Sequence, residues 1–316
     1  KVRCPACLSR ESFRPDGNAL LCTSCAQKYP VVEGIPVLID EKKSVFRKED
    51  FTSGRRLFFD TTRGGTRLSS VGRVLSSLGG KTGTANYRHL RELLKRGASR
   101  PRVLVLGGSI AGMGMDELLA DPELEIVESD VSFGPRTQII LDAHDIPYAD
   151  ETFDGVIAQA VLEHVLDPFQ CVAEIVRVLR PEGLVYAETP FMQQVHGGAY
   201  DFHRFTHSGH RRLFKRFDEI ASGAIAGAGT AMAWSYEYLL LALFGYSRVS
   251  RLFCKGFARC TGFWLKFLDT PARWNPYSIE GASGYYFLGR KSDQTMSDEE
   301  IVRYYGQTVG RERSAR

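Results

Sequence analysis

The chain has 316 residues, 43% of them hydrophobic and 25% charged, which is enough for one large domain and a small accessory one. These proportions are ordinary for a soluble globular protein and exclude a disordered or fibrous chain. The formal net charge of +4 is too small to indicate a partner by itself.

Residues 1–40 carry two tight pairs of cysteines, Cys4-Pro-Ala-Cys7 and Cys22-Thr-Ser-Cys25. Two such knuckles can place four thiolates tetrahedrally around Zn²⁺. A module of this size has too little core to fold alone, so a metal would supply what burial cannot. We therefore predict a zinc ribbon over residues 1–40 with Cys4, Cys7, Cys22 and Cys25 as ligands. The alternative is a degenerate ribbon that has lost its metal.

The cysteine pattern also bears on the cellular compartment. The first residues, Lys1-Val-Arg-Cys4, contain no apolar signal segment, and the paired cysteines favour metal binding over disulfides. We expect a cytoplasmic, reduced protein.

The ribbon ends in Tyr29-Pro-Val-Val-Glu-Gly-Ile-Pro-Val-Leu-Ile39. This stretch is similar to the ending of the small zinc-ribbon proteins that activate tRNA and protein methyltransferases. Ribbons of this kind are also fused to the front of bacterial methyltransferases, including those that modify rRNA.

Residues 41–100 are expected to form a basic linker followed by a helix around Leu90–Arg96 that Gly97 ends. Between Glu41 and Arg102 there are 16 Lys and Arg residues against five Asp and Glu residues. The segment from Asp116 to Asp154, in contrast, holds 12 acids and one Arg. A basic segment beside an acidic core indicates an anionic partner such as RNA, a lipid headgroup or a phosphorylated carrier. The alternative is a solvated linker face.

Residues 101–291 alternate strand and helix patterns, which predicts an α/β domain with a parallel sheet. The expected strands are short apolar runs at residues 103–106, 124–127, 155–158 and 184–187. Apolar residues at helical spacing predict a helix over 168–179, and 285–290 reads as a last, antiparallel strand. The segment 292–316 is predicted as a polar, frayed tail.

Four motifs follow one another within this domain: Asp142-Ala-His-Asp-Ile-Pro-Tyr148, Phe153-Asp-Gly-Val-Ile157, Val161-Leu-Glu-His-Val165 and Arg177-Val-Leu-Arg-Pro-Glu-Gly183. Their order and spacing resemble class I methyltransferases that depend on S-adenosylmethionine (SAM), in particular the type 11 group. The resemblance implies a Rossmann-like sheet of seven strands, SAM as the cofactor and methyl transfer as the activity.

The glycine-rich turn after the first strand is the expected cofactor site, with Gly107, Gly108, Ser109 and Gly112 letting the backbone approach a ligand and open the next helix. Asp130 follows the second strand, where a carboxylate can accept hydrogen bonds from both ribose hydroxyls, and Glu128 is a competing candidate. Ser109 and Val105 depart from the family pattern, which usually has a glycine and an acidic residue there.

The resemblance assigns two further parts of the cofactor. Asp142 and Ala143 match the position that holds the adenine, with the Asp142 side chain on the exocyclic amine. Gln159, at the end of the fourth strand, matches the position where the methionine part lies.

A histidine-rich segment from His196 to His210 follows the fifth strand, and it should overhang the acceptor. It resembles the His-Gly-x-x-x-Asp-x-x-Arg-Phe-Thr stretch of bacterial methyltransferases often associated with surface-sugar and natural-product pathways. His203 and His196 are the candidate bases, and Asp201 is expected to orient one of them. The remaining candidates, which would contact the acceptor, are His164, Tyr200 and Arg204. The alternative is that these groups pin the loop by local hydrogen bonds.

A helical insertion at about 226–282 precedes the last strand. It combines a nearly uncharged stretch at 231–246 with an apolar stripe and a basic stripe over 248–267. Such a helix can lie on an anionic membrane surface, which would make the protein peripheral at the inner membrane surface. The alternative is the buried face of a packed helix.

Taken together, these patterns predict SAM-dependent methylation of a small-molecule or carrier-linked acceptor, at the oxygen of a sugar or natural-product hydroxyl. An RNA methyltransferase is the alternative that the ribbon and the basic segment support. A non-catalytic scaffold is the alternative that Val105, Ser109 and the activator-like ribbon support. The sequence predicts no oligomeric state.

Overall fold

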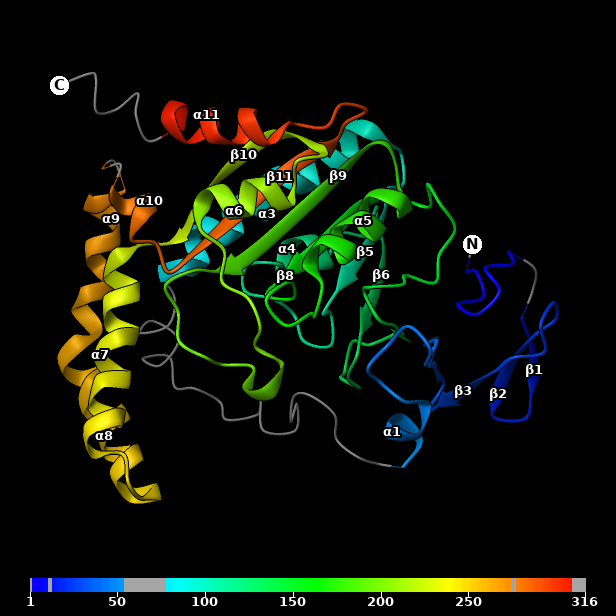
Figure 1. The fold of residues 1–316 in the computed structure, drawn as a ribbon, viewed down its shortest axis with the longest axis horizontal. Helices are drawn as coiled ribbons and strands as arrows, with labels where there is room; N and C mark the ends of the chain where they lie inside the picture. Colours follow the sequence, from blue (N-terminus) through cyan, green and yellow to red (C-terminus); the bar gives the residue numbers. More distant parts are fainter. Residues whose placement is uncertain (1, 11–12, 54–77, 274, 276, 309–316) are drawn as a thin grey trace.

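The computed structural model describes residues 2–10, 13–53, 78–273, 275 and 277–308 (Figure 1). Within these residues the strands form a sheet of seven in the order β10-β11-β9-β8-β5-β6-β7 and a sheet of four in the order β1-β2-β3-β4. About half of the predicted basic linker, residues 54–77, lies outside the described part of the chain.

The large sheet contains the strands β5 (Arg102–Leu106), β6 (Glu125–Asp130), β7 (Ile139–Ile140), β8 (Phe153–Gln159), β9 (Leu179–Pro190), β10 (Phe217–Ala226) and β11 (Gly284–Lys291). Strands β5 to β9 pair in parallel, whereas β11 is antiparallel to both β9 and β10. A reversed strand inserted at this place is the topology of the class I methyltransferase sheet, so the predicted fold class is confirmed.

Helices cover both faces of this sheet. Successive side chains of each strand point to opposite faces, so alternate residues pack against different helices. On one face, Tyr87, Leu90 and Leu94 of α3 (Leu78–Gly97) pack with the strand residues Val103 and Ile157. On the other face, α5 (Pro168–Val178) packs on the intervening residues of β5, β8 and β9. The buried, uncharged runs of the central strands follow from this double cover.

Two expectations about local structure are wrong. The helix after the glycine-rich turn, α4 (Asp116–Leu119), is only four residues long and does not begin at the glycines. The predicted frayed tail forms the helix α11 (Asp298–Thr308), which lies along the outer edge of the molecule (Figure 1). Ile301 is buried and the Tyr304 ring stacks on the His207 ring. These contacts stabilise a helix that the polar composition of the segment did not predict.

The small sheet consists of β1 (Phe13–Asp16), β2 (Ala19–Cys22), β3 (Lys28–Val32) and β4 (Ile35–Pro36), and it is followed by α1 (Lys48–Thr52). It docks on the outer strand of the large sheet, where Val37 forms a parallel bridge with Ile140 and the Leu38 N–H donates to the Ile140 carbonyl at 2.9 Å. Arg3 adds ion pairs to Asp145 and Glu174 at 3.1 and 3.4 Å. The ribbon thus covers an otherwise open sheet edge.

The segment between β10 and β11 contains α7 (Ala228–Phe244), α8 (Arg248–Gly262), η3 (Phe263–Leu268), α9 (Asp269–Ala272) and α10 (Tyr277–Glu280). Helices α7 and α8 form a hairpin that extends past one end of the large sheet (Figure 1). Asp269 fixes its base by accepting hydrogen bonds from the Gly227 and Gly229 N–H groups at 3.0 and 2.7 Å. In the described ranges no helix combines the length and hydropathy needed to cross a membrane.

Candidate active site

A cavity of about 770 Å³ opens at the carboxyl ends of β5, β6, β8 and β9, where ligands bind in parallel sheets of this type. Most of the predicted cofactor residues contribute to its wall, namely Gly107, Ser109, Gly112, Asp130, Asp142, Ala143 and Gln159. Ile225 of β10 and the insertion residues Thr230, Trp234 and Lys266 close the other side.

The glycine-rich turn depends on glycines, because a side chain at Gly107 or Gly112 would collide with neighbouring groups. Gly107 has φ of +71°, and a Cβ atom there would lie 2.6 Å from the Val161 Cγ2 atom. A Cβ atom on Gly112 would overlap the Gln159 side chain. Gly108 differs from the prediction because it is not part of the cavity wall. It packs between the strands, where its Cβ would come within 3.2 Å of both Glu128 and Val105.

Asp130, the last residue of β6, lies at the cavity wall with both carboxylate oxygens on backbone donors. Its Oδ2 accepts from the Ser109 N–H at 3.0 Å and its Oδ1 from the Ser132 N–H at 2.9 Å. Burial raises the pKa of Asp130. Glu128 also faces the cavity, but its carboxylate pairs with the Arg136 guanidinium at 2.6 Å. This pairing leaves Asp130 as the better candidate for a ribose diol.

Asp142 is 5% exposed and engaged by protein groups. Its Oδ2 accepts from the Ser44 hydroxyl at 2.5 Å, and its Oδ1 lies 2.6 Å from the His144 Nδ1 atom. Burial raises the pKa of Asp142, but the hydrogen bonds from His144 and Ser44 outweigh burial and hold that pKa below its usual range. Sequence reasoning missed Ser44 because it lies in a segment without a periodic pattern.

The segment after the ribbon forms part of the cavity wall, which the sequence did not predict. Val45 and Phe46 line the cavity, and the Phe46 ring stacks on Tyr200 with the centroids 6.1 Å apart. Phe51 of α1 packs behind Phe46. Residues 44–51, which follow the ribbon, therefore form one wall of the candidate cofactor site. We call them the wall segment.

Glu188, near the end of β9, is a second wall residue that the sequence analysis missed. It accepts hydrogen bonds from the Gln159 side-chain amide at 2.8 Å and from the Tyr186 hydroxyl at 2.6 Å. Burial raises the pKa of Glu188. A carboxyl group is thus present beside Gln159 although position 105, where the family often has an acid, is a buried valine.

The candidate acceptor residues separate into two groups. His164, His196 and Tyr200 line the cavity together with Glu163. The centroids of the two imidazole rings are 4.9 Å apart. His203, in contrast, is not among the described lining residues, and its Nε2 atom lies 3.2 Å from the Leu166 carbonyl oxygen.

Asp201 and Arg204 form an ion pair within the loop around residues 196–206, and neither is among the described lining residues of the cavity. The Arg204 guanidinium holds the pKa of Asp201 well below its usual range. Arg204 also donates to the Gln193 and Gln194 carbonyl groups at 2.9 and 3.1 Å. Asp201 accepts from the His196 N–H at 2.7 Å, and its Oδ2 lies 3.4 Å from the His196 Nδ1 atom. The pair therefore fixes the loop that carries His196.

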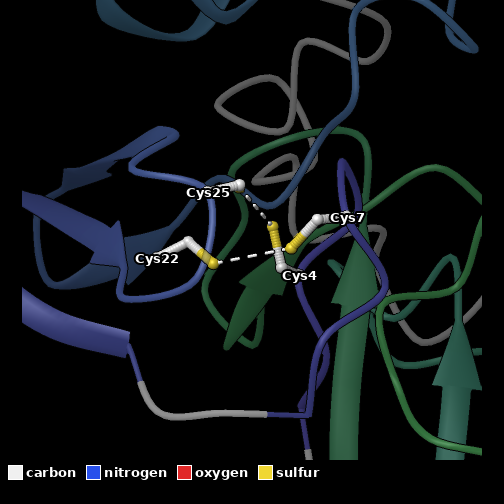
Figure 2. Close-up of side chains that lie close together, drawn as sticks. All are labelled: Cys4, Cys7, Cys22 and Cys25. Carbon is white, nitrogen blue, oxygen red and sulfur yellow. Dashed lines mark hydrogen bonds between the residues drawn. The ribbon is translucent and has the colours of Figure 1, made fainter.

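The four predicted zinc ligands converge in the ribbon. Figure 2 shows Cys4 and Cys7 on the first loop facing Cys22, at the end of β2, and Cys25, on the turn after it. The sulfur atoms of Cys4 and Cys25 are 3.7 Å apart, and those of Cys7 and Cys22 are 3.8 Å apart. Zn–S bonds of about 2.3 Å at tetrahedral angles place sulfur atoms about 3.8 Å apart. The cluster fits a closed, structural zinc site.

The sequence was compared with models of known protein families. The model of a methyltransferase domain matches residues 113–187. A search of curated proteins found no significant match.

Solved structures resemble this chain at low sequence identity and with TM-scores below 0.5. A candidate sarcosine dimethylglycine methyltransferase from Galdieria sulphuraria is 16% identical, with a TM-score of 0.42 over 76% of this chain and 92% of that one. Phosphoethanolamine N-methyltransferase 2 from Haemonchus contortus is 14% identical, with a TM-score of 0.39 over 65% and 53%. A SAM-dependent methyltransferase from Methanosarcina mazei is 14% identical, with a TM-score of 0.37 over 62% and 95%.

Proposed function

Because the chain contains a class I SAM-dependent methyltransferase domain, we propose that it methylates a hydroxyl group of a small-molecule or carrier-linked acceptor. The observation that carries this proposal is that one cavity joins the predicted cofactor residues of the sheet to the surroundings of His164 and His196. A cofactor and an acceptor bound in one cavity meet the geometric requirement for transfer.

In this proposal each part of SAM would have a partner among the wall residues. Asp130 would hold the ribose hydroxyls and the backbone around Asp142 and Ala143 the adenine, while Gln159 and Glu188 would hold the methionine part. The glycine turn at Gly107 would let the cofactor lie against the backbone. SAM supplies an electrophilic methyl group on its sulfonium.

Transfer is an in-line displacement. The acceptor oxygen forms a bond to the methyl carbon, the S–C bond breaks, and S-adenosylhomocysteine and the hydroxyl proton are released. His196 faces the cavity and His203 does not, so we assign activation of the acceptor hydroxyl to His196.

A comparison of His196→Ala with His203→Ala tests this assignment. Loss of His196 should lower kcat by about 100-fold or more with SAM affinity retained, whereas His203→Ala should cost much less. The exposed His89→Ala is the matched control. An equal loss of kcat in the His196 and His203 variants would contradict the assignment.

The helical hairpin favours an acceptor on a lipid-like carrier. The predicted apolar stripe is not buried against the protein, since Phe253 is 71% and Trp264 51% exposed. The basic side chains Arg248, Arg251 and Lys255 are exposed on the helix that carries Phe253. An apolar surface combined with basic charge suits an anionic lipid interface. Because the same insertion lines the cavity, an acceptor held at that interface would enter directly.

Vesicle sedimentation tests the membrane contact. The protein should sediment with vesicles of anionic phospholipid more than with neutral vesicles, and Phe253→Asp should release it. Val302→Asp, on the exposed face of α11, is the matched control. Equal sedimentation of wild type and Phe253→Asp would contradict the contact. Salt-sensitive binding of RNA in place of vesicles would favour the RNA alternative, whose basic segment falls partly outside the described residues.

A further inference from the structure

Glu163 is a buried carboxylate that meets two imidazole rings at the acceptor end of the cavity. Its side chain is fully buried, and neither of its oxygens has a hydrogen-bond partner among the described residues. Its Oε1 atom lies 3.6 Å from His196 Nε2 and 3.8 Å from His164 Nε2. One ligand atom from each of the three residues lies within 4.8 Å of the others. An ionised carboxylate buried in this way requires a compensating positive charge.

The far nitrogens of both rings are oriented by backbone carbonyl groups. His164 Nδ1 lies 2.9 Å from the Tyr200 carbonyl oxygen, and His196 Nδ1 lies 3.3 Å from the Gln194 carbonyl oxygen. A carbonyl oxygen only accepts, so the Nδ1–H group of each ring donates to it, and the Nε2 atom of each ring faces Glu163. Outer hydrogen bonds of this kind orient histidines that bind metals.

The separations fit a metal ion between the three groups. Ligand bonds of about 2.0–2.2 Å at tetrahedral angles place ligand atoms about 3.3–3.6 Å apart. The observed separations of 3.6 and 3.8 Å are slightly larger, whereas direct hydrogen bonds would be shorter. Two histidines and one carboxylate on one side of an ion leave coordination positions open to the cavity.

The surrounding loop is built to hold these side chains. A Cβ atom on Gly197 would lie 2.5 Å from His164 Nδ1, so a side chain at this position would displace the ring. The Asp201–Arg204 pair anchors the backbone of His196. These contacts involve the Nδ1 side of His164 and the backbone of His196, and they set the positions of both imidazoles.

We propose that Glu163, His164 and His196 bind a divalent transition metal ion, with Zn²⁺ as the probe, at the acceptor end of the cavity. The role of this ion rests on the proposed function. With His196 holding the ion through Nε2, an acceptor hydroxyl on an open coordination position would have a lowered pKa and release its proton to solvent water. His196 would then activate the hydroxyl through the ion and would not itself take the proton. Its oxygen would then take the methyl group from the sulfonium as described above.

Zinc content after dialysis tests the site in the full chain, without any acceptor. The wild-type chain should retain one more zinc ion than Glu163→Gln or His196→Ala, and His89→Ala should match wild type. With Co²⁺, the ion lost in the variants should lack the thiolate charge-transfer band that the four-cysteine ribbon gives. Thermal unfolding and SAM titration of each variant show whether it is folded.

Equal zinc content in wild type and folded Glu163→Gln would overturn the inference. A folded His196→Ala variant that retains all of the wild-type zinc would overturn it as well. Either result would leave the proposed methyl transfer intact if wild type still produced S-adenosylhomocysteine. If wild type bound the second zinc ion but produced no S-adenosylhomocysteine, the proposed methyl transfer would be rejected and the metal site would stand.

Discussion

Five histidines occur between residues 164 and 210, and the fold gives them different environments. His164 and His196 face the cavity, while His203 stacks on Phe205 away from it. His207 and His210 are buried in the core. Sequence spacing alone cannot separate these environments because the loop around residues 196–206 has no regular period. The sequence therefore predicted the loop and left the choice among its histidines open.

His210 should make the stability of the protein depend on pH. Burial lowers the pKa of His210 to about 3, whereas the ordinary value is about 6.5. Between these values the unfolded chain binds more protons, so the free energy of unfolding falls as the pH falls below about 6.5. His210→Phe keeps a ring against Phe214 and Phe287. Between about pH 7 and pH 5 its free energy of unfolding should fall by about 2 kcal/mol less than that of wild type.

Urea unfolding of wild type and His210→Phe at both pH values measures this difference. His89→Ala, which changes an exposed histidine, should follow wild type. Parallel pH dependence of wild type and His210→Phe would contradict the account.

Gly107 should be indispensable to the cofactor turn. Gly107→Ala adds a methyl group against Val161 at a positive φ, so it should distort the turn and weaken SAM binding by about tenfold or more. Calorimetric titration measures the affinity. Gly256→Ala, on an exposed stretch of α8 with no atom within 4 Å of the added group, should bind SAM as wild type does. Equal affinities in the two variants would show that the turn tolerates a side chain.

Among the elements, the central strands could be predicted because buried parallel strands require continuous apolar runs such as Val103–Leu106. The wall segment (residues 44–51) could not be predicted, since Ser44 and Phe46 are held by Asp142 and Tyr200, which are far away in the sequence. Propensity and periodicity describe local preferences and carry no information about such contacts.

The ribbon and the cofactor site should be coupled through this wall segment. Chelation of the ribbon zinc, or Cys22→Ser, should loosen the docking at Val37 and lower the affinity for SAM. Cys260→Ser, which changes an exposed cysteine on α8, is the matched control. Calorimetry of the folded variants provides the comparison, and unchanged SAM affinity in Cys22→Ser would show that the wall segment holds its position without the ribbon.

On the scale of the whole molecule, three parts of the chain meet at one cavity: the ribbon's wall segment, the carboxyl ends of the sheet and the base of the helical insertion. The insertion leaves its outer apolar face exposed, and the cavity lies at its base. In the proposed function, this arrangement would combine cofactor binding, acceptor entry and a surface for a lipid-like carrier in one body.

The central claim is that this cavity binds SAM with Asp130 on the ribose. Calorimetric titration of SAM into wild type and Asp130→Ala tests it most directly, with Asp116→Ala, on the exposed face of α4, as the control. Wild type and Asp116→Ala should bind with equal affinity, and Asp130→Ala should bind about tenfold or more weakly. Absence of binding by wild type at millimolar SAM, or full affinity in Asp130→Ala, would contradict the claim.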